Sequence, residues 1–207
     1  LEPLGLARWQ LAVKRTMDVV IASTVLVLTS PLLAAAAVAI KLQDRGPVLF
    51  RQERIGFRGR PLRVLKLRTM VPDAEQRRGE VANDRDGGPL FKAATDPRRT
   101  RVGRLLEATS MDELPQLINV LRGEMSLVGP RPALPSEVAQ FDDELLERLS
   151  VAPGITGLWQ VEARDNPAFH AYRRLDLFYV ENWSVMLDFA ILLGTVRSLV
   201  FRPLQRS

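Results

Sequence analysis

The adjacent carboxylates Asp112 and Glu113 are the residues of this sequence best suited to covalent chemistry. They lie in a basic neighbourhood near an expected helix start, within VGRLLEATSMDELPQLINVLRGE (residues 102–124). A carboxylate at such a place can attack phosphorus and form an acyl phosphate, provided that its repulsion from the phosphate is cancelled. Mg²⁺ binds through one or two carboxylates together with phosphate oxygens, so two acids suffice to hold it. One interpretation is therefore phosphoryl transfer, with Mg²⁺ at Asp112 and Glu113.

A purely structural interpretation explains the same residues. Ser110-x-x-Glu113 matches a capping box, in which Ser110 caps a helix and Glu113 returns the contact. Acidic residues in a first helical turn also favour the helix dipole, and Pro115 suits a first turn. On residue spacing alone the capping interpretation is the stronger of the two.

An uncharged run from Val19 to Ile40 is the element around which the chain is organised. As a helix it would be about 33 Å long, enough to cross the roughly 30 Å hydrocarbon core of a membrane. Pro31 lies near its middle and predicts a kink, and basic residues flank both ends, whereas spanning helices have their basic excess on one side. We therefore favour a re-entrant hairpin broken at Ser30-Pro31, with the Ser30 hydroxyl satisfying a freed carbonyl. A kinked spanning helix and a buried core helix are the alternatives.

A basic hairpin is expected directly after this run, at about residues 46–70. The segments VLFRQERIG and LRVLKLRTM flank the turn-rich FRGRP. Eight basic residues and one acid, Glu53, occur between Arg45 and Arg68. So concentrated a charge beside a membrane segment favours contact with phosphates over a merely solvated face.

The rest of the chain predicts helices and one long loop. Residues 72–101 are polar and rich in glycine and proline, which is typical of a mobile loop over a site. Residues 136–150 predict an acidic amphipathic helix, and residues 168–181 a second helix. The apolar segment 184–201 predicts a third helix, either in the core or in the membrane interface.

Together these elements predict an α+β fold that is mostly helical. It would contain a re-entrant membrane helix broken at Ser-Pro, a small β-hairpin and interfacial amphipathic helices. Residues 1–45 would form the lead-in and membrane helix. Residues 46–207 would form one catalytic region on the cytoplasmic side.

Composition narrows the classes of partner. The 207 residues include no cysteine, which excludes a disulfide framework and a thiolate metal site. The net charge is +5, with twenty-five arginines against four lysines. Arginine suits phosphate recognition, so a nucleotide, anionic lipid headgroups and nucleic acid are the natural partners. Nucleic acid is disfavoured, because the basic hairpin offers only Phe50 and Phe57 for base stacking.

Several long motifs occur in order between about residue 12 and residue 200. They are Lys14-Arg15-x-x-Asp18, Ser30-Pro31, GPVLFRQERIG, KLRTM, DPRRTRVGRLL, TSMDELPQLINVLRGEMSLVGPRP, PGITGLWQV and ENWSVMLDFAILL. In this combination the chain resembles the bacterial sugar transferases, the monotopic phosphoglycosyl transferases that start exopolysaccharide, capsule or O-antigen assembly. Larger members of that family carry additional N-terminal membrane helices, which suits a chain that begins at Leu1.

The resemblance implies a reaction and assigns roles in it. Asp112 would be the nucleophile and would bind Mg²⁺ together with Glu113. It would attack the β-phosphate of a UDP-sugar, release UMP and become a sugar-phosphoryl aspartate, from which polyprenyl (undecaprenyl) phosphate takes the phosphosugar. Lys66, Arg68 and Arg131 would bind substrate phosphates.

The resemblance also implies a place in the cell. The enzyme would lie on the cytoplasmic face of the bacterial inner membrane as a monotopic protein, with membrane lipids and no nucleic acid as partners. A homodimer and a monomer both stay open. The motifs do not name the sugar, because hexose and N-acetylhexosamine enzymes share them.

Glu107 departs from the family pattern, which usually has arginine five residues before the nucleophile. Arg104, one helical turn earlier, is the candidate to compensate as a phosphate contact. Two unit charges about 8 Å apart repel by roughly 2 kcal/mol at an effective dielectric near 20, so Glu107→Arg is predicted to raise kcat/KM at least tenfold if Glu107 points at the site. If Glu107 instead faces solvent or pairs with Arg104, the change is predicted to do little or to lower stability. The same departure supports a second function, a catalytically weak membrane scaffold that recruits later glycosyltransferases.

Overall fold

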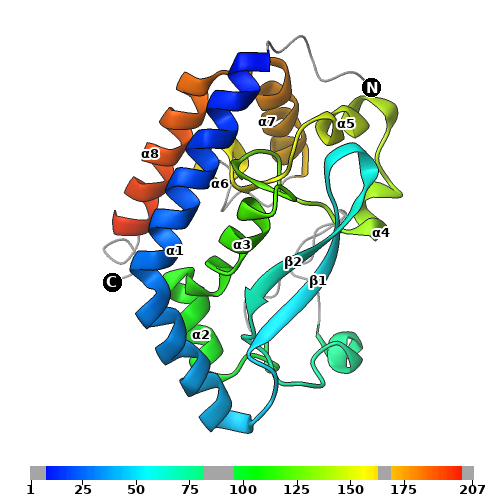
Figure 1. Ribbon diagram of the computed structural model, residues 1–207. Helices are drawn as coiled ribbons and strands as arrows, with labels where there is room; N and C mark the ends of the chain where they lie inside the picture. The colour runs from blue at the N-terminus through cyan, green and yellow to red at the C-terminus, as the bar shows by residue number, and fades with distance from the viewer. Residues whose placement is uncertain (1–7, 82–95, 163–168, 202–207) are drawn as a thin grey trace.

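The computed structural model describes residues 8–81, 96–162 and 169–201, and its mostly helical body carries two small sheets (Figure 1). A basic hairpin and a long apolar helix lie on different sides of a group of shorter helices. The elements, in chain order, are α1 (Arg8–Asp44), β1 (Leu49–Ile55), η1 (Phe57–Gly59), β2 (Pro61–Leu67), η2 (Gln76–Glu80), α2 (Arg101–Thr109), η3 (Met111–Glu113), α3 (Gln116–Leu121), β3 (Ser126–Val128), α4 (Pro135–Val138), α5 (Asp143–Leu146), η4 (Glu147–Ser150), β4 (Gly154–Thr156), α6 (Leu158–Glu162), α7 (Phe169–Glu181) and α8 (Val185–Phe201). This confirms the mostly helical α+β class.

Helix α1 contains Pro31 and continues through it as one element of 37 residues. Figure 1 shows that the helix changes direction partway along its length. Proline has no N–H to donate to the carbonyl four residues earlier, that of Val27. The Ser30 hydroxyl donates to this carbonyl at 2.8 Å. The structure therefore shows one bent helix that continues through Ser30-Pro31, and it does not confirm the break expected there.

Both halves of α1 pack against the same protein body. Asp18 and Ala22 are buried in the first half, and Ala36 and Ile40 in the second. The helix contacts α2, α3, β3 and α8. Its outer side is apolar and exposed, with Val20, Val27, Leu28, Leu32 and Val38 all more than half accessible. Within the described residues α1 is the one helix long and apolar enough to cross a membrane.

The residues of the Lys14-Arg15-x-x-Asp18 motif fasten the first half of α1 to this body. The Arg15 guanidinium donates to the last carbonyls of α3, those of Val120 at 2.6 Å and Leu121 at 2.8 Å. A buried carboxylate oxygen of Asp18 accepts the backbone N–H of Leu127, in β3, at 3.0 Å. These bonds fix both the position and the rotation of α1.

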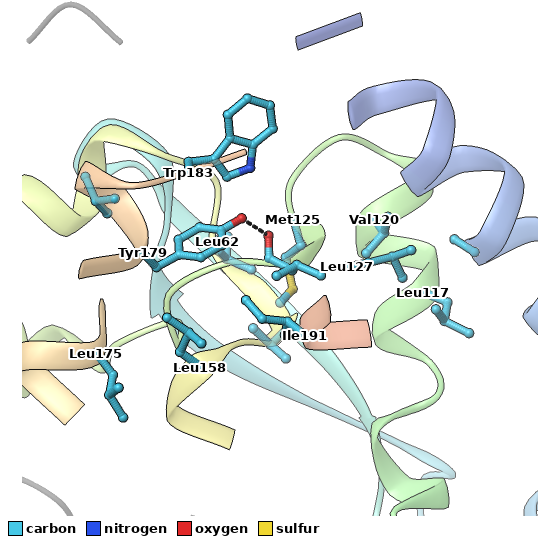
Figure 2. Packing of buried hydrophobic residues seen from close by; sticks show 14 residues of the cluster. Leu62, Leu117, Val120, Met125, Leu127, Leu158, Leu175, Tyr179, Trp183 and Ile191 are labelled. Carbon is cyan, nitrogen blue, oxygen red and sulfur yellow. Dashed lines mark hydrogen bonds between the residues drawn. The ribbon is translucent and has the colours of Figure 1, made fainter. Parts of the chain in front are cut away.

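Lys14 makes the third attachment, to a buried carboxylate of α8. Its ammonium lies 2.5 Å from Asp188 Oδ2, and it also donates to the carbonyl of Val128 at 3.1 Å. The Tyr179 hydroxyl lies 2.7 Å from the other Asp188 oxygen and 3.0 Å from the Val128 carbonyl. Figure 2 shows Tyr179 within the hydrophobic cluster, with the bond to Val128 dashed. The hydrogen bonds among Lys14, Asp188, Tyr179 and the carbonyl of Val128 hold α1, α7, α8 and β3 together.

We expect Lys14→Met to destabilise the fold by about 3 kcal/mol, because it leaves a fully buried carboxylate without its cation. The measurement is the thermal midpoint of the detergent-solubilised protein. Lys41→Met, at an exposed position of the same helix, is the matched control. Adding Asp188→Asn to Lys14→Met should recover part of the loss, and an unchanged midpoint for Lys14→Met would contradict the role given to this pair.

The predicted hairpin is confirmed. β1 and β2 pair antiparallel, in a register that runs from Leu49 opposite Leu67 to Ile55 opposite Pro61. The fully buried Asn119 of α3 holds β2 from the side, because it accepts the N–H of Leu65 at 3.0 Å and donates to the carbonyl of Arg63 at 2.8 Å. These bonds fix β2 against α3, and β2 also contacts η3, the segment that carries Asp112 and Glu113.

Two of the predicted helices are confirmed and one is wrong. Helix α7 corresponds to the prediction for residues 168–181, of which residue 168 lies outside the described part, and α8 corresponds to 184–201. The single helix expected over 136–150 is replaced by α4, α5 and η4. A new helix begins after Asp142, because the Asp142 carboxylate accepts the N–H of Leu145 at 2.9 Å and so caps α5. Of the loop predicted over 72–101, residues 82–95 lie outside the described residues, and the described part contains the short helix η2.

Candidate active site

A cavity of about 420 Å³ opens between the hairpin, the segment after β2, α2 and η3. Its walls include apolar side chains such as Leu49, Phe50 and Leu134, together with many charged ones. The cations that line it are Arg54, Lys66, Arg68, Arg98, Arg99 and Arg131, and the acids are Glu75, Asp96, Glu107, Asp112 and Glu137. A site of this size and charge suits an anionic ligand with an organic part.

Asp112 lies in the wall of this cavity, in the short turn η3 between α2 and α3. Its side chain is buried, and burial is the main reason that its pKa is raised to about 7. The charges of Glu113 and Glu107 raise the pKa further, whereas Lys66 lowers it. A raised carboxyl pKa in a cleft is typical of a functional site.

The capping-box interpretation of this segment is wrong. Ser110 adopts a left-handed backbone conformation, with φ 57°, and its side chain caps no helix. This conformation ends α2 and turns the chain, so that Asp112 and Glu113 sit in η3 instead of the first turn of a long helix. The acidic pair is thus not explained by helix capping.

Lys66 connects the hairpin to the acidic pair. It lies near the end of β2, and its ammonium is 2.9 Å from Glu113 Oε1. Both side chains stay about a quarter exposed. The structure therefore brings Lys66 together with Asp112 and Glu113, which follow it by 46 and 47 positions in the sequence.

Arg131 lines the same cavity. Its guanidinium bonds to both carboxylate oxygens of the buried Glu137, at 3.0 and 3.2 Å. Arg54, which the sequence analysis did not single out, lies beside it and donates to the carbonyl of Pro132 at 3.0 Å. Burial, assisted by the charge of Arg131, lowers the pKa of Arg54 to about 10. Its place in the GPVLFRQERIG motif is the sequence feature that could have indicated Arg54 as a site residue.

Arg68 and Arg104 are placed differently from the other predicted phosphate contacts. Arg68 lines the cavity, but its guanidinium is buried and bonds to the carboxylate of Asp44 and the carbonyl of Pro47. It therefore fastens the end of α1 to the end of β2. Arg104 is exposed on α2 and is not among the cavity residues. The structure does not bring it together with Asp112.

Glu107 points into the cavity, as the sequence analysis assumed, but it is paired. Its carboxylate Oε2 lies 2.9 Å from Nε of Arg99, and both side chains line the cavity. Arg104, the expected compensating residue, is not the partner in this ion pair. The isolated repulsive charge inferred from the sequence is therefore balanced by a cation that the sequence analysis overlooked, although Arg99 stands in the DPRRTRVGRLL motif.

The pairing of Glu107 with Arg99 changes what we expect of Glu107→Arg. The variant places two guanidinium groups in contact, so the gain in cavity charge is offset by mutual repulsion. We expect kcat/KM to rise less than about threefold and the thermal midpoint to fall. The double variant Arg99→Glu/Glu107→Arg restores the pair and should recover the midpoint. A tenfold rise in kcat/KM for Glu107→Arg alone would contradict this expectation.

Comparison with known proteins accounts for this arrangement. The family model described as bacterial sugar transferase matches residues 9–202. This chain belongs to the bacterial sugar transferase family. The match extends over every described element except the first residue of α1, so the acidic pair, the hairpin and the apolar helix all belong to the family's domain.

Curated members of the family are similar over most of this chain. The undecaprenyl-phosphate galactose phosphotransferase of Salmonella typhimurium is 39% identical over 91% of this chain and 40% of its own length. The UDP-glucose:undecaprenyl-phosphate glucose-1-phosphate transferase of Caulobacter vibrioides is 44% identical over 90% of this chain and 69% of its own. The exopolysaccharide production protein ExoY of Rhizobium meliloti is 38% identical over 88% and 83%. The chain spans about two fifths of the length of the Salmonella protein and of two further curated relatives that it matches.

The donor atoms in this bacterial sugar transferase domain limit how a metal ion could bind. Among the residues described here, no group of three or more His, Asp or Glu side chains is placed to hold one. Asp112 and Glu113 offer two carboxylates, which is the number that Mg²⁺ takes when substrate phosphates complete its ligands. These two residues therefore fit Mg²⁺ whose remaining ligands come from substrate phosphates.

Proposed function

We propose that this chain transfers a sugar-1-phosphate from a UDP-sugar to polyprenyl phosphate and releases UMP, as the first membrane step of bacterial surface polysaccharide assembly. The observation that carries the proposal is the buried Asp112 in a cavity whose accessible cations include Lys66 and Arg131. The Salmonella and Caulobacter relatives are both named as undecaprenyl-phosphate transferases, which supports the same reaction class.

In the first step a carboxylate oxygen of Asp112 attacks the β-phosphorus of the donor. The bond from that phosphorus to the bridging oxygen breaks, and UMP leaves with the oxygen and its electron pair. The product on the protein is an acyl phosphate that carries the sugar. Asp112 attacks only when ionised, and the nearby Lys66 ammonium favours that form.

In the second step a phosphate oxygen of polyprenyl phosphate attacks the same phosphorus. The acyl phosphate bond breaks, Asp112 is regenerated as a carboxylate, and polyprenyl diphosphate-sugar forms. Dividing the transfer in this way lets one cavity serve a soluble donor and a lipid acceptor in turn. Lys66 and Arg131 would bind phosphate oxygens in both steps.

Mg²⁺ is the cofactor that we propose, held by Asp112 and Glu113. When bound it neutralises charge on the phosphates, which is the main requirement of phosphoryl transfer. Lys66 keeps Glu113 in place beside Asp112 through their 2.9 Å contact. The chain's own contribution is thus to hold Asp112 and Lys66 in the cavity wall, with Glu113 next to Asp112 and in contact with Lys66.

The test is incubation of the purified protein with a panel of UDP-sugars in the absence of lipid acceptor. One donor should release UMP in about stoichiometric amount and leave its sugar phosphate on a peptide that contains Asp112. Adding polyprenyl phosphate should then start turnover. Failure of every UDP-sugar to release UMP would favour the alternative, a membrane scaffold without catalysis.

We further propose that α1 is re-entrant, so that both of its ends lie on the cytoplasmic side of the inner membrane. Lys14 near one end bonds to Asp188, and Asp44 at the other end bonds to Arg68, both in the same body. A helix that crossed the membrane would have to separate these two attachments. Exposed apolar residues of α8 extend the surface offered to lipid, namely Met186, Phe189, Leu193, Val196 and Phe201.

Labelling of single cysteines tests this topology, because the chain has no cysteine of its own. We expect Arg8→Cys and Arg45→Cys both to resist an impermeant reagent in intact cells and both to react in inverted vesicles. Both replaced arginines are exposed, so the substitutions leave the core intact. Labelling of one position from outside and the other from inside would show a spanning helix.

A further inference from the structure

Three of the cations that line the cavity keep about a quarter of their side chains exposed. They are Lys66 at 27%, Arg99 at 26% and Arg131 at 24%. Arg68 and Arg98, by contrast, are 7% and 6% exposed. An anion that enters the cavity meets the accessible cations first. Lys66 and Arg131 already have a proposed role, whereas Arg99 has none.

The backbone around Arg99 is held on both sides. Arg98 forms a buried ion pair with Asp96 at 2.7 Å and donates to the carbonyl of Ala74 at 3.0 Å. Its own carbonyl accepts the N–H of Val71 at 2.9 Å. On the other side, the N–H of Thr100 donates to the carbonyl of Thr69 at 3.0 Å. The position of the Arg99 backbone is therefore fixed before its side chain makes any contact.

Helix α2, which carries Glu107, is fixed against the same segment. Gly103 lies so close to the backbone of Thr69 that an added Cβ would come within 1.8 Å of its carbonyl oxygen. Glu107 follows one turn later on this helix and reaches Arg99 across the cavity wall at 2.9 Å. Two rigidly placed backbones thus define where the Arg99 guanidinium lies.

We propose that Arg99 is a further binding residue for the donor's diphosphate, and that Glu107 is the positioning residue that holds its guanidinium at the cavity wall. This inference rests on the proposed function, which supplies the diphosphate. Arginine binds phosphate through several N–H groups at once, so a guanidinium already held in place loses less freedom on binding. Glu107 also balances the charge of Arg99 while the cavity has no anion in it. An acid five residues before Asp112 then serves the binding of substrate instead of opposing it.

The first test is equilibrium binding of UDP and of uridine to the detergent-solubilised full chain. Arg99→Ala should weaken UDP binding about tenfold and leave uridine binding unchanged, because only UDP carries the phosphates. Arg101→Ala, at an exposed position of α2 outside the cavity, is the matched control and should change neither affinity. Arg99→Lys should recover part of the loss. A structural disturbance would instead weaken both ligands and lower the thermal midpoint.

The second test is a double-mutant cycle between Glu107 and Arg99. In the Arg99→Ala background Glu107→Gln should strengthen UDP binding, since it removes an unbalanced carboxylate. In the wild-type background the same change should give a gain at least about threefold smaller, or a loss, because Arg99 is no longer held. Equal effects in the two backgrounds would overturn the positioning role of Glu107.

The outcomes separate this inference from the proposed function. If the wild type binds UDP and releases UMP while Arg99→Ala binds UDP equally well, the inference fails and the function stands. If the wild type neither binds UDP nor releases UMP from any UDP-sugar, the function fails and the inference fails with it.

Discussion

Asp112→Asn is expected to lower UMP release by about 10³-fold or more and to abolish the sugar-phosphate adduct. An amide has the shape of the carboxyl group but cannot attack phosphorus. The measurement is single-turnover UMP release with the donor identified in the panel, together with mass spectrometry of the peptide. Asp143→Asn, at an exposed position of α5, is the control and should keep full activity. Near-normal turnover by Asp112→Asn would remove the covalent mechanism.

The same variant has an expected signature in stability. Burial raises the pKa of Asp112 in the folded protein to about 7, above the value of 3.8 for a free carboxyl group. The folded state therefore holds the proton more tightly than the unfolded state, and stability falls as the pH rises from about 4 to about 7. Without divalent ions, Asp112→Asn should have a higher thermal midpoint than the wild type at pH 8. The difference should vanish near pH 4.

Lys66→Met is expected to have the second largest effect, a loss of about 10²-fold in kcat/KM. It removes the charge that most lowers the pKa of Asp112, and it leaves Glu113 without its 2.9 Å partner. It also removes one of the three accessible cations that we assign to substrate phosphates. Less Asp112 is then ionised at neutral pH, so the pH at which activity rises should move upward.

Lys66→Arg is the matched control for this variant. It keeps a positive charge near Glu113 and should keep activity within about tenfold of the wild type. The pH profile of kcat/KM separates loss of charge from loss of packing, because a packing defect lowers activity without moving the profile. Activity of Lys66→Met within about threefold of the wild type would contradict the role of Lys66.

Local sequence patterns predicted the elements that depend mainly on nearby residues. Alternating segments on either side of FRGRP specified the hairpin, since each strand needs only its neighbour across a short turn. Apolar periodicity located α7 and α8 in the same way. Predictions from local patterns were wrong where a single residue changes the direction of the backbone. Asp142 divides the helix expected over 136–150. Ser110 itself adopts the left-handed conformation that ends α2, and its side chain does not cap the next turn.

The candidate nucleophile and its acidic neighbour were also visible in the sequence, because their types, spacing and motif are local. Their environment was not. The raised pKa of Asp112 comes chiefly from burial, and its neighbour Glu113 takes its cation from a strand 47 residues earlier. A pattern of residue types contains no information about burial of this kind.

Residue types and their spacing predicted a long apolar helix, a basic hairpin and an acidic pair in a family-specific order. The pairing of the charged side chains depends on the tertiary structure. Arg68, a predicted phosphate contact, lines the cavity and bonds to Asp44, while Glu107, predicted to repel substrate, is balanced by Arg99. Lys14 forms its ion pair with Asp188, which lies 174 positions later in the sequence. Ion pairs form between groups that folding brings within a few ångströms, and packing of the whole chain sets those distances.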